Sequence, residues 1–395
     1  MIKKYDKEKK KSIIGLLGCF CINNILYMFL NTFMVAYFIT LTNYNYKLIS
    51  IYYIANFICI ALTFYLLGSI IKKHSKVKIF RTGIVLYCLY ILLIALLKEK
   101  IVDYHIWLGA AYGIVQGVLW APGLSLVNEY VKDDSNNFVS LKSILTQILK
   151  IIMPFILGAS IELTSFSFIA LIILFLSIIQ FCFSLLIKND TNSKNSKYNL
   201  KEYIKYVQNK KTLKTYYKLV ACDGIVNYML ATVVTILIVT TFKTSFNLGM
   251  LTTIFSACSI LSVYLFQRVI KRKNNTIRVC TVMMIISLVT LLIDINKYTI
   301  IIYNLFNSLF LILLINSAEA KRYEIITKDK KASSNYIVEH QILSEICLNI
   351  ARILGYLVLF IASILNKTII FKTMLIIITI IIVIYSYLLI KIEKE

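Results

Sequence analysis

Charged residues are scarce in this chain, and most of them are basic. Only 16% of its 395 residues are charged, and 19 Asp and Glu stand against 43 Lys and Arg. The chain also has just two prolines and 12 glycines, too few turn-forming residues for a loop-rich or all-β protein. Since soluble domains carry about 25% charged residues, the composition excludes a soluble globular protein and a disordered chain.

Apolar residues fill the chain instead, at 59% and with a mean hydropathy of +0.78. Runs of about 20 apolar residues have the length that crosses a bilayer as a helix. Such runs predict an all-α integral membrane protein with twelve transmembrane helices. The predicted spans lie near 13–41, 48–71, 82–97, 102–127, 138–160, 164–187, 215–242, 245–270, 277–294, 298–318, 336–363 and 367–390.

The net charge of +24 is concentrated in alternate loops. Of the 43 Lys and Arg, 34 fall in the two termini and in the loops on the same side, and seven fall in the loops of the opposite side. Cytoplasmic loops retain positive charge, so both termini are predicted to be cytoplasmic. Attraction to anionic lipid accounts for such basic loops, and we expect no nucleic-acid partner.

Motifs for catalysis or metal binding are missing from the sequence. The nine cysteines fall within predicted spans and form no pattern with the three histidines, so we interpret them as small apolar packing residues and expect no metal and no cofactor. Hydrolase, metalloprotease, P-loop and dinucleotide-binding motifs are missing too, and we do not expect an enzyme. A channel and a membrane-embedded enzyme are the rival classes, although outer loops such as 42–47 are too short for a re-entrant filter.

The two halves of the sequence repeat each other. The segment from Cys21 to Met28 matches that from Cys222 to Met229, at an offset of 201. The string YLLGSIIKK, which ends span 2, recurs as YLFQRVIKR at an offset of 199, and the start of span 5 at 137 recurs at 335. Shared apolar composition does not explain matched Tyr, Asn and Lys positions, so a six-span unit is duplicated.

This duplication divides the chain into an N-terminal six-helix bundle, 1–187, a basic cytoplasmic linker, 188–214, and a C-terminal six-helix bundle, 215–395. Six spans return the chain to the same side of the membrane. The two bundles therefore share their orientation and are related by a pseudo-two-fold axis along the membrane normal. This arrangement resembles the major facilitator superfamily of transporters, and the resemblance covers essentially the whole chain.

The loop after span 2 also resembles a signature of that family, in which a glycine, three residues and an aspartate precede a basic cluster. Here Gly68 is followed by three residues and then by Lys72 in place of the aspartate, with further basic residues at Lys73, Lys76 and Lys78. The resemblance implies that this aspartate helps to latch the two halves together on the cytoplasmic side. Lys72 is therefore a departure from the family's latch.

Four ionisable residues lie deep within predicted spans, where each charge costs roughly 2.5–3.5 kcal/mol on insertion scales. They are Lys150 in span 5, Asp223 in span 7, and Glu345 and Arg352 in span 11. The family resemblance implies that spans 1, 4, 7 and 10 line a central cavity, with 2, 5, 8 and 11 beside them. We therefore expect all four to bind substrate or couple transport, or alternatively to neutralise one another between helices.

The pattern within span 11 makes these roles more specific. Glu345, Asn349 and Arg352 share one helical face at positions i, i+4 and i+7, and we expect Asp223 or Glu345 to neutralise Arg352. Lys150, whose half has no deep acid, is predicted to bind an acidic group of the substrate. Asp223 and Glu345 are the candidates for proton exchange, because a carboxyl group in a low-dielectric site can exchange protons near neutral pH.

Uncharged polar residues complete the predicted substrate-binding or coupling site. They are Asn23, Asn24 and Asn31 in span 1, Gln116 and Trp120 in span 4, and Asn227 in span 7. Span 1 carries no acid, unlike many drug/proton antiporters of the family. Gly109, Gly113 and Gly117 have the four-residue spacing that lets helices pack closely.

These features predict a secondary active transporter that moves a small organic solute by alternating access. Without an ATP-binding motif, uphill transport needs an ion gradient, and we expect coupling to protons. Export is the expected direction, and a proton-coupled importer is the alternative. The Lys-, Ile- and Asn-rich composition is typical of an AT-rich bacterial genome, which indicates the plasma membrane. The expected partners are the solute, membrane lipid and protons, and the chain is expected to act as a monomer.

The predicted topology can be tested with single cysteines in a cysteine-free variant. Ser196→Cys, in the basic linker, should react with a membrane-impermeant maleimide only in inverted vesicles, because positive loops stay in the cytoplasm. Lys47→Cys, in an outer loop, should react only in right-side-out vesicles. Labelling of the linker cysteine from outside intact cells would contradict the topology.

Overall fold

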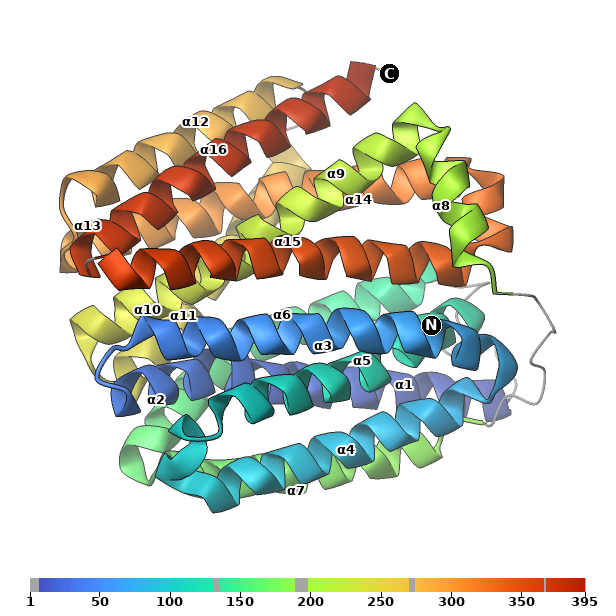
Figure 1. Cartoon of the computed structure of the whole chain (residues 1–395), viewed down its shortest axis with the longest axis horizontal. Coiled ribbons are helices and arrows are strands. Elements are labelled where there is room, and N and C mark those ends of the chain that lie inside the picture. Colours follow the sequence, from blue (N-terminus) through green and yellow to red (C-terminus); the bar gives the residue numbers. More distant parts are fainter. Residues whose placement is uncertain (1–6, 131–134, 189–197, 270–273, 366, 395) are drawn as a thin grey trace.

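The computed structural model describes residues 7–130, 135–188, 198–269, 274–365 and 367–394. Within these residues the chain is nearly all helical and contains no strand. The long helices run roughly along the long axis of the molecule (Figure 1). This architecture suits a hydrocarbon solvent, because a helix satisfies its backbone hydrogen bonds within itself.

The first half of the chain forms the helices drawn from blue to green in Figure 1. Side-chain caps mark several of their starts: Ser75 accepts a hydrogen bond from the amide of Lys78, and Ser165 accepts one from the amide of Phe168. Such caps satisfy amides that a helix start leaves free. The elements are α1 (Lys7–Met28), η2 (Phe29–Phe33), α2 (Met34–Leu41), α3 (Tyr46–Lys73), α4 (Lys76–Leu97), η3 (Lys98–Val102), α5 (His105–Tyr130), α6 (Ser135–Leu163) and α7 (Phe166–Leu185).

The second half follows the same plan after one short helix. Asn296 caps α13 by accepting hydrogen bonds from the amides of Tyr298 and Thr299. The elements are α8 (Leu200–Gln208), α9 (Lys211–Gly224), η4 (Ile225–Met229), α10 (Leu230–Phe242), α11 (Ser245–Val269), α12 (Asn274–Ile293), α13 (Lys297–Phe306), η5 (Asn307–Leu311), α14 (Ile312–Lys328), η6 (Lys331–Asn335), α15 (Ile337–Leu365) and α16 (Lys367–Lys394).

Twelve helices in the described ranges are long and apolar enough to cross a membrane, which confirms the number predicted from the sequence. Their outer faces expose large apolar side chains, such as Leu66 at 63% and Phe175 at 63%, as expected of surfaces that face lipid. One predicted boundary is wrong. The sequence predicts that the tenth span ends at 318 and that 321–331 form a loop, whereas the helix continues to Lys328. This last stretch is polar, and its composition therefore predicts a loop. In the structure it is helical because it packs against neighbouring helices.

Small residues bring α5 close to α3. A Cβ atom at Gly109 would collide with the carbonyl oxygen of Tyr52, and one at Gly113 would collide with that of Asn56. The glycine spacing therefore serves helix packing, as its sequence pattern indicates. The close contact therefore brings the side chains of α3 next to those of α5.

In the described structure the two halves meet mainly along two pairs of helices. α3 lies beside α15 at the boundary between the two groups of helices in Figure 1, and α6 packs against α11. In the first pair, the rings of Tyr53 and Tyr356 lie with their centroids 4.6 Å apart. In the second pair, Gly158 and Gly249 bring the two backbones together. These pairs form the interface across which any relative movement of the halves must occur.

The described part of the predicted linker is helical and packed. Tyr203 and Val207 of α8 are buried, and the Tyr203 hydroxyl lies 3.0 Å from Nδ1 of His340. The next helix already begins at Lys211, and the polar stretch 191–196 that was expected to be flexible lies outside the described residues. We use "linker end" for the end of the bundle that carries α8, at the right of Figure 1, and "far end" for the opposite one.

Lys72 forms a buried ion pair that joins the halves at the linker end. Its Nζ lies 2.6 Å from Oε1 of Glu339 at the start of α15, and the two side chains are 7% and 0% exposed. The backbone amide of Asn199, just before α8, donates to the same oxygen at 3.0 Å. The lysine that replaces the aspartate of the resembled signature thus contacts an acid in the opposite half.

Reversing the charge at Lys72 tests whether this pair holds the halves together. Lys72→Glu places two acids in a buried site and should lower the stability by about 3–5 kcal/mol, the usual cost of breaking a buried pair. The double variant Lys72→Glu/Glu339→Lys should recover most of the loss. The measurement is the thermal unfolding midpoint of the purified chain in detergent. A double variant as unstable as the single one would show that the pair contributes no specific attraction.

Candidate functional site

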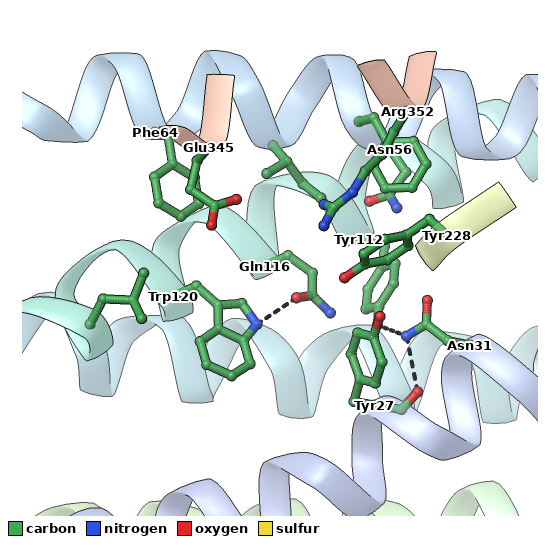
Figure 2. Close-up of a pocket in the computed structure, with 13 residues that line it drawn as sticks. Tyr27, Asn31, Asn56, Phe64, Tyr112, Gln116, Trp120, Tyr228, Glu345 and Arg352 are labelled. Atoms are coloured by element: carbon green, nitrogen blue, oxygen red, sulfur yellow. Dashed lines mark hydrogen bonds between the residues drawn. The ribbon is translucent and has the colours of Figure 1, made fainter. Parts of the chain in front are cut away.

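A cavity of about 250 Å³ lies between the two halves of the described structure. Its walls come from α1, η2, α3 and α5 of the first half and from η4 and α15 of the second. Figure 2 shows their side chains pointing into a common space. The lining residues are Tyr27, Asn31, Asn56, Phe57, Ile60, Phe64, Tyr112, Gln116, Trp120, Leu124, Tyr228, Glu345 and Arg352. Because both halves contribute, a movement of one half against the other would change the cavity.

Two π-helical segments contribute to the cavity wall. η2 carries Asn31 and begins just after Tyr27, and η4 carries Tyr228. Such segments are rare and are frequent at functional sites. Tyr27 and Tyr228 are also the tyrosines that the sequence repeat matches. The duplication therefore places one tyrosine from each half in the same cavity.

Three side-chain amides and three tyrosine hydroxyls are among the neutral polar groups of the cavity. Nε1 of Trp120 donates to Oε1 of Gln116 at 2.8 Å, and Nδ2 of Asn31 donates to the Tyr112 hydroxyl at 2.8 Å, as the dashed lines of Figure 2 show. These bonds leave the amide nitrogen of Gln116 and the carbonyl oxygen of Asn31 available to a ligand. Oδ1 of Asn56 is buried and has no hydrogen-bond partner in the described structure.

Arg352 is buried, with 7% of its surface exposed, and lies over two aromatic rings. Its guanidinium carbon is 3.5 Å from the ring centroid of Tyr228 and 5.3 Å from that of Phe57. Nη1 donates to Oδ1 of Asn349 at 3.0 Å, whereas Nε is buried without a partner among the described residues. The rings stabilise the cation, and the flat guanidinium keeps further donors available to a ligand.

The predicted neutralisation of Arg352 does not occur by direct ion pairing with Asp223 or Glu345, although the charge of Arg352 acts on Glu345. Neither acid forms an ion pair with Arg352, and Glu345 has no ion pair to any described residue. Glu345 and Arg352 do line one cavity from the same helical face, as their spacing predicts. Seven residues of helix separate their Cα atoms by about 10 Å. Asn349 lies between them and donates to the backbone carbonyl of Glu345 at 2.7 Å.

Asp223 belongs to a separate polar cluster inside the second half. It accepts hydrogen bonds from Arg322 at 3.1 Å, from Asn227 at 2.7 Å and from the Tyr385 hydroxyl at 3.3 Å. The side chains of Arg322 and Asp223 are only 16% and 11% exposed. Arg322 is not among the residues predicted from the sequence, because the composition of 321–331 predicts a loop. A usable signal was Asp223 itself, because an acid inside a span requires a basic partner.

Lys150, which the sequence predicts to bind an acidic group of the substrate, does not line this cavity. It is exposed on α6, about 200° around the helix from Ile148 and about 240° from Ile144, two exposed apolar residues. The lysine therefore occupies the polar face of α6, opposite the apolar one. Glu319 of α14 is the acid whose charge acts on it. The two form a second charged region apart from Arg352 and Glu345.

The three asparagines of span 1 have different surroundings. Only Asn31 lines the cavity. Asn24 donates to the hydroxyl of Thr146 at 3.2 Å and so connects α1 to α6. Asn23 is buried beside Gln180, next to a narrow void, and its Oδ1 has no hydrogen-bond partner in the described part of the chain.

Much of the cavity wall was not predicted from the sequence. The missed residues are Tyr27, Asn56, Phe57, Ile60, Phe64, Tyr112, Leu124 and Tyr228. Aromatic residues make up 13% of the chain, so residue type alone does not distinguish those that face the cavity. The sequence repeat was a usable signal for Tyr27 and Tyr228, and no local pattern marks the others.

Solved structures with the same architecture are membrane transporters. The structure of the nucleoside transporter NupG has a TM-score of 0.65 and 14% identity, covering 99% of this chain and 100% of that one. A bacterial homologue of the iron transporter ferroportin in the inward-facing state has a TM-score of 0.66 and 12% identity, covering 98% and 99%. A bacterial homologue of the human lysosomal transporter Spinster has a TM-score of 0.60 and 11% identity, covering 99% and 98%.

These similarities show that the chain has the fold of those solved structures. The family model of the Major Facilitator Superfamily matches residues 16–320, more than half of the chain. The chain therefore belongs to the Major Facilitator Superfamily, as its resemblance to that family predicts, and its substrate is a small molecule. A comparison with curated proteins found no match.

The different surroundings of Asp223 and Glu345 lead to a test of stability. Asp223→Asn leaves Arg322 buried without its anion and should cost about 3 kcal/mol or more, whereas Glu345→Gln breaks no ion pair and should change the stability by less than about 1 kcal/mol. Thermal unfolding midpoints in detergent measure both. The double variant Asp223→Asn/Arg322→Gln should recover part of the loss. Equal midpoints for the two single variants would contradict a structural role of Asp223.

Proposed function

We propose that this chain is a proton-coupled secondary transporter that exports a small organic solute by alternating access. The main support for this proposal is the cavity between the two halves, which is lined by Glu345 and Arg352. Neither residue forms an ion pair with a described residue. Charged groups in the membrane interior are expensive and mark substrate or ion pathways. A cavity lined from both halves also satisfies the geometry that alternating access needs.

The moving units in this proposal are the bundles 1–187 and 215–395, connected by the linker 188–214. Contacts between them lie on both sides of the cavity. The Lys72–Glu339 pair joins them at the linker end, and the α6–α11 contact at Gly158 and Gly249 lies towards the far end. Rocking of the bundles would open one of these contacts while the other stays closed.

Glu345 is the proposed site of proton exchange. It lines the cavity and has no ion pair, whereas Asp223 is engaged by Arg322, Asn227 and Tyr385. The charged groups that act on Glu345 are Arg352, Asp223 and Arg322. We assign Asp223 and its partner Asn227 to the support of the second half.

The remaining polar residues divide into a solute-binding set and a supporting set. Arg352, Asn31, Gln116 and Trp120 line the cavity and are proposed to bind the solute. Asn349 orients Arg352, and Asn23 and Asn24 support span 1. Lys150 lies outside the cavity, on the polar face of α6. We propose that it attracts acidic groups of the solute towards the cavity.

Direction and location follow from the sequence in this proposal. Aromatic-rich spans without a sugar-porter-like signature favour export, and the charge asymmetry of the loops places both termini in the cytoplasm of a bacterial plasma membrane. The monomer contains a complete cavity, which favours a monomeric transporter. Uptake by proton symport is the second candidate, because an acid in the cavity would couple either direction.

Inverted membrane vesicles test the proposal without a known substrate. Vesicles that contain the chain and have an acidic lumen should accumulate at least one solute from a cell extract, detected by untargeted mass spectrometry, and a protonophore should abolish the accumulation. Glu345→Gln should lose the gradient-driven accumulation, because a neutral amide does not exchange protons, and Glu99→Gln, at an exposed position of the far end, should retain it. Lys150→Gln should slow the accumulation.

The same assay separates the candidate functions. Accumulation in right-side-out vesicles with an acidic exterior, and none in inverted ones, would identify an importer. Accumulation that ignores the pH gradient would exclude proton coupling. Full activity of Glu345→Gln would remove this residue from the coupling step.

A further inference from the structure

The two charged residues of the cavity are of opposite sign, and neither has an ion-pair partner among the described residues. Glu345 and Arg352 both line it, and no ion pair connects either to another residue in the described part of the chain. Figure 2 shows both side chains turned towards the same space from α15. Unpaired charges in the interior of a membrane protein are costly unless something compensates them. A ligand that compensates both must carry one charge of each sign.

The Arg352 side of the cavity has the features of a carboxylate site. The guanidinium carbon of Arg352 lies 3.5 Å from the ring centroid of Tyr228. The buried Nε of Arg352 has no hydrogen-bond partner among the described residues. A planar guanidinium with free in-plane donors matches the two oxygens of a carboxylate. The Glu345 side offers the complementary acceptor for an ammonium group.

The neutral walls favour a ligand with a flat apolar body and further hydrogen-bonding groups. Phe57, Phe64 and Trp120 provide ring faces and edges, which pack well against aromatic groups. Oδ1 of Asn56 is buried without a partner in the described structure and accepts a hydrogen from an N–H or O–H group. The volume of about 250 Å³ limits the ligand to a small molecule.

We infer that the cavity binds a zwitterionic amino carboxylate with an aromatic ring, its carboxylate on Arg352 and its ammonium group on Glu345. This inference rests on the proposed transport function and specifies its substrate class. It also accounts for the direction of coupling. An ammonium group and a proton compete for the same carboxylate, so solute and proton would cross in opposite directions.

Three related probes with the same phenyl ring test the substrate class. They are L-phenylalanine, 2-phenylethylamine, which lacks the carboxylate, and 3-phenylpropionate, which lacks the ammonium group. Titration calorimetry on the purified full-length chain should give a Kd for phenylalanine at least about tenfold lower than for either relative, the factor expected for one charged hydrogen-bonded contact. Uridine, a neutral ring compound, should bind no better than the relatives.

Variants assign each charge to its partner. Arg352→Gln should remove the preference for phenylalanine over 2-phenylethylamine and keep the preference over 3-phenylpropionate. Glu345→Gln should do the reverse. Lys297→Gln and Glu99→Gln, which remove one exposed charge of each sign at the far end, should keep both preferences. If Arg352→Gln does not fold, Arg352→Lys keeps the charge without the flat guanidinium and should weaken phenylalanine binding while sparing 2-phenylethylamine.

The outcomes separate this inference from the transport proposal. Equal affinities for the three probes, tighter binding of uridine, or no binding of any probe would overturn the zwitterion class, even if inverted vesicles still accumulate another solute. The expected binding pattern without gradient-driven accumulation of phenylalanine in vesicles would support the ligand class and overturn the transport proposal.

Discussion

The cost of an unpaired charge in a hydrocarbon environment is the constraint on which this structure depends. Several charges avoid this cost by forming ion pairs inside the protein. Asp223 pairs with Arg322 within the second half, and Lys72 pairs with Glu339 between the halves. For Arg352 the cost is only partly offset, by contact of the guanidinium with the rings of Tyr228 and Phe57. The protein thus neutralises the charges that hold helices together and leaves a pair of opposite charges in the cavity, which the proposed solute would neutralise.

Duplication of a six-span unit explains why the cavity lies where it does. Two similar bundles in the same orientation bring equivalent positions towards their common boundary, and Tyr27 and Tyr228 meet there from the two halves. The charges do not follow this symmetry, because Glu345 and Arg352 both belong to α15 of the second half. The symmetric part of the chain therefore builds the scaffold, and the asymmetric part supplies the two charges of the cavity.

The latch at the linker end shows how a structural role can survive a change of sign. The resembled signature has an aspartate where this chain has Lys72, so the sequence alone predicts that the contact between the halves made by that aspartate is missing. In the structure Lys72 finds Glu339, and the amide of Asn199 shares the same carboxylate oxygen. Attraction across a buried interface depends on opposite charges at a short distance and is indifferent to which half carries which sign.

The sequence by itself determined the number of spans, the all-helical class, the family and the presence of charges within the membrane. Each follows from residue type and from spacing along one helix, as the shared face of Glu345, Asn349 and Arg352 also does. Only the tertiary structure decided that Arg322 rather than Arg352 pairs with Asp223, that Lys150 stays out of the cavity, and which aromatic rings line it. Helical periodicity gives the direction of a side chain relative to its own helix. Its neighbours depend on how the helices pack, and contacts such as those at Gly109 and Gly158 set that packing across long stretches of sequence.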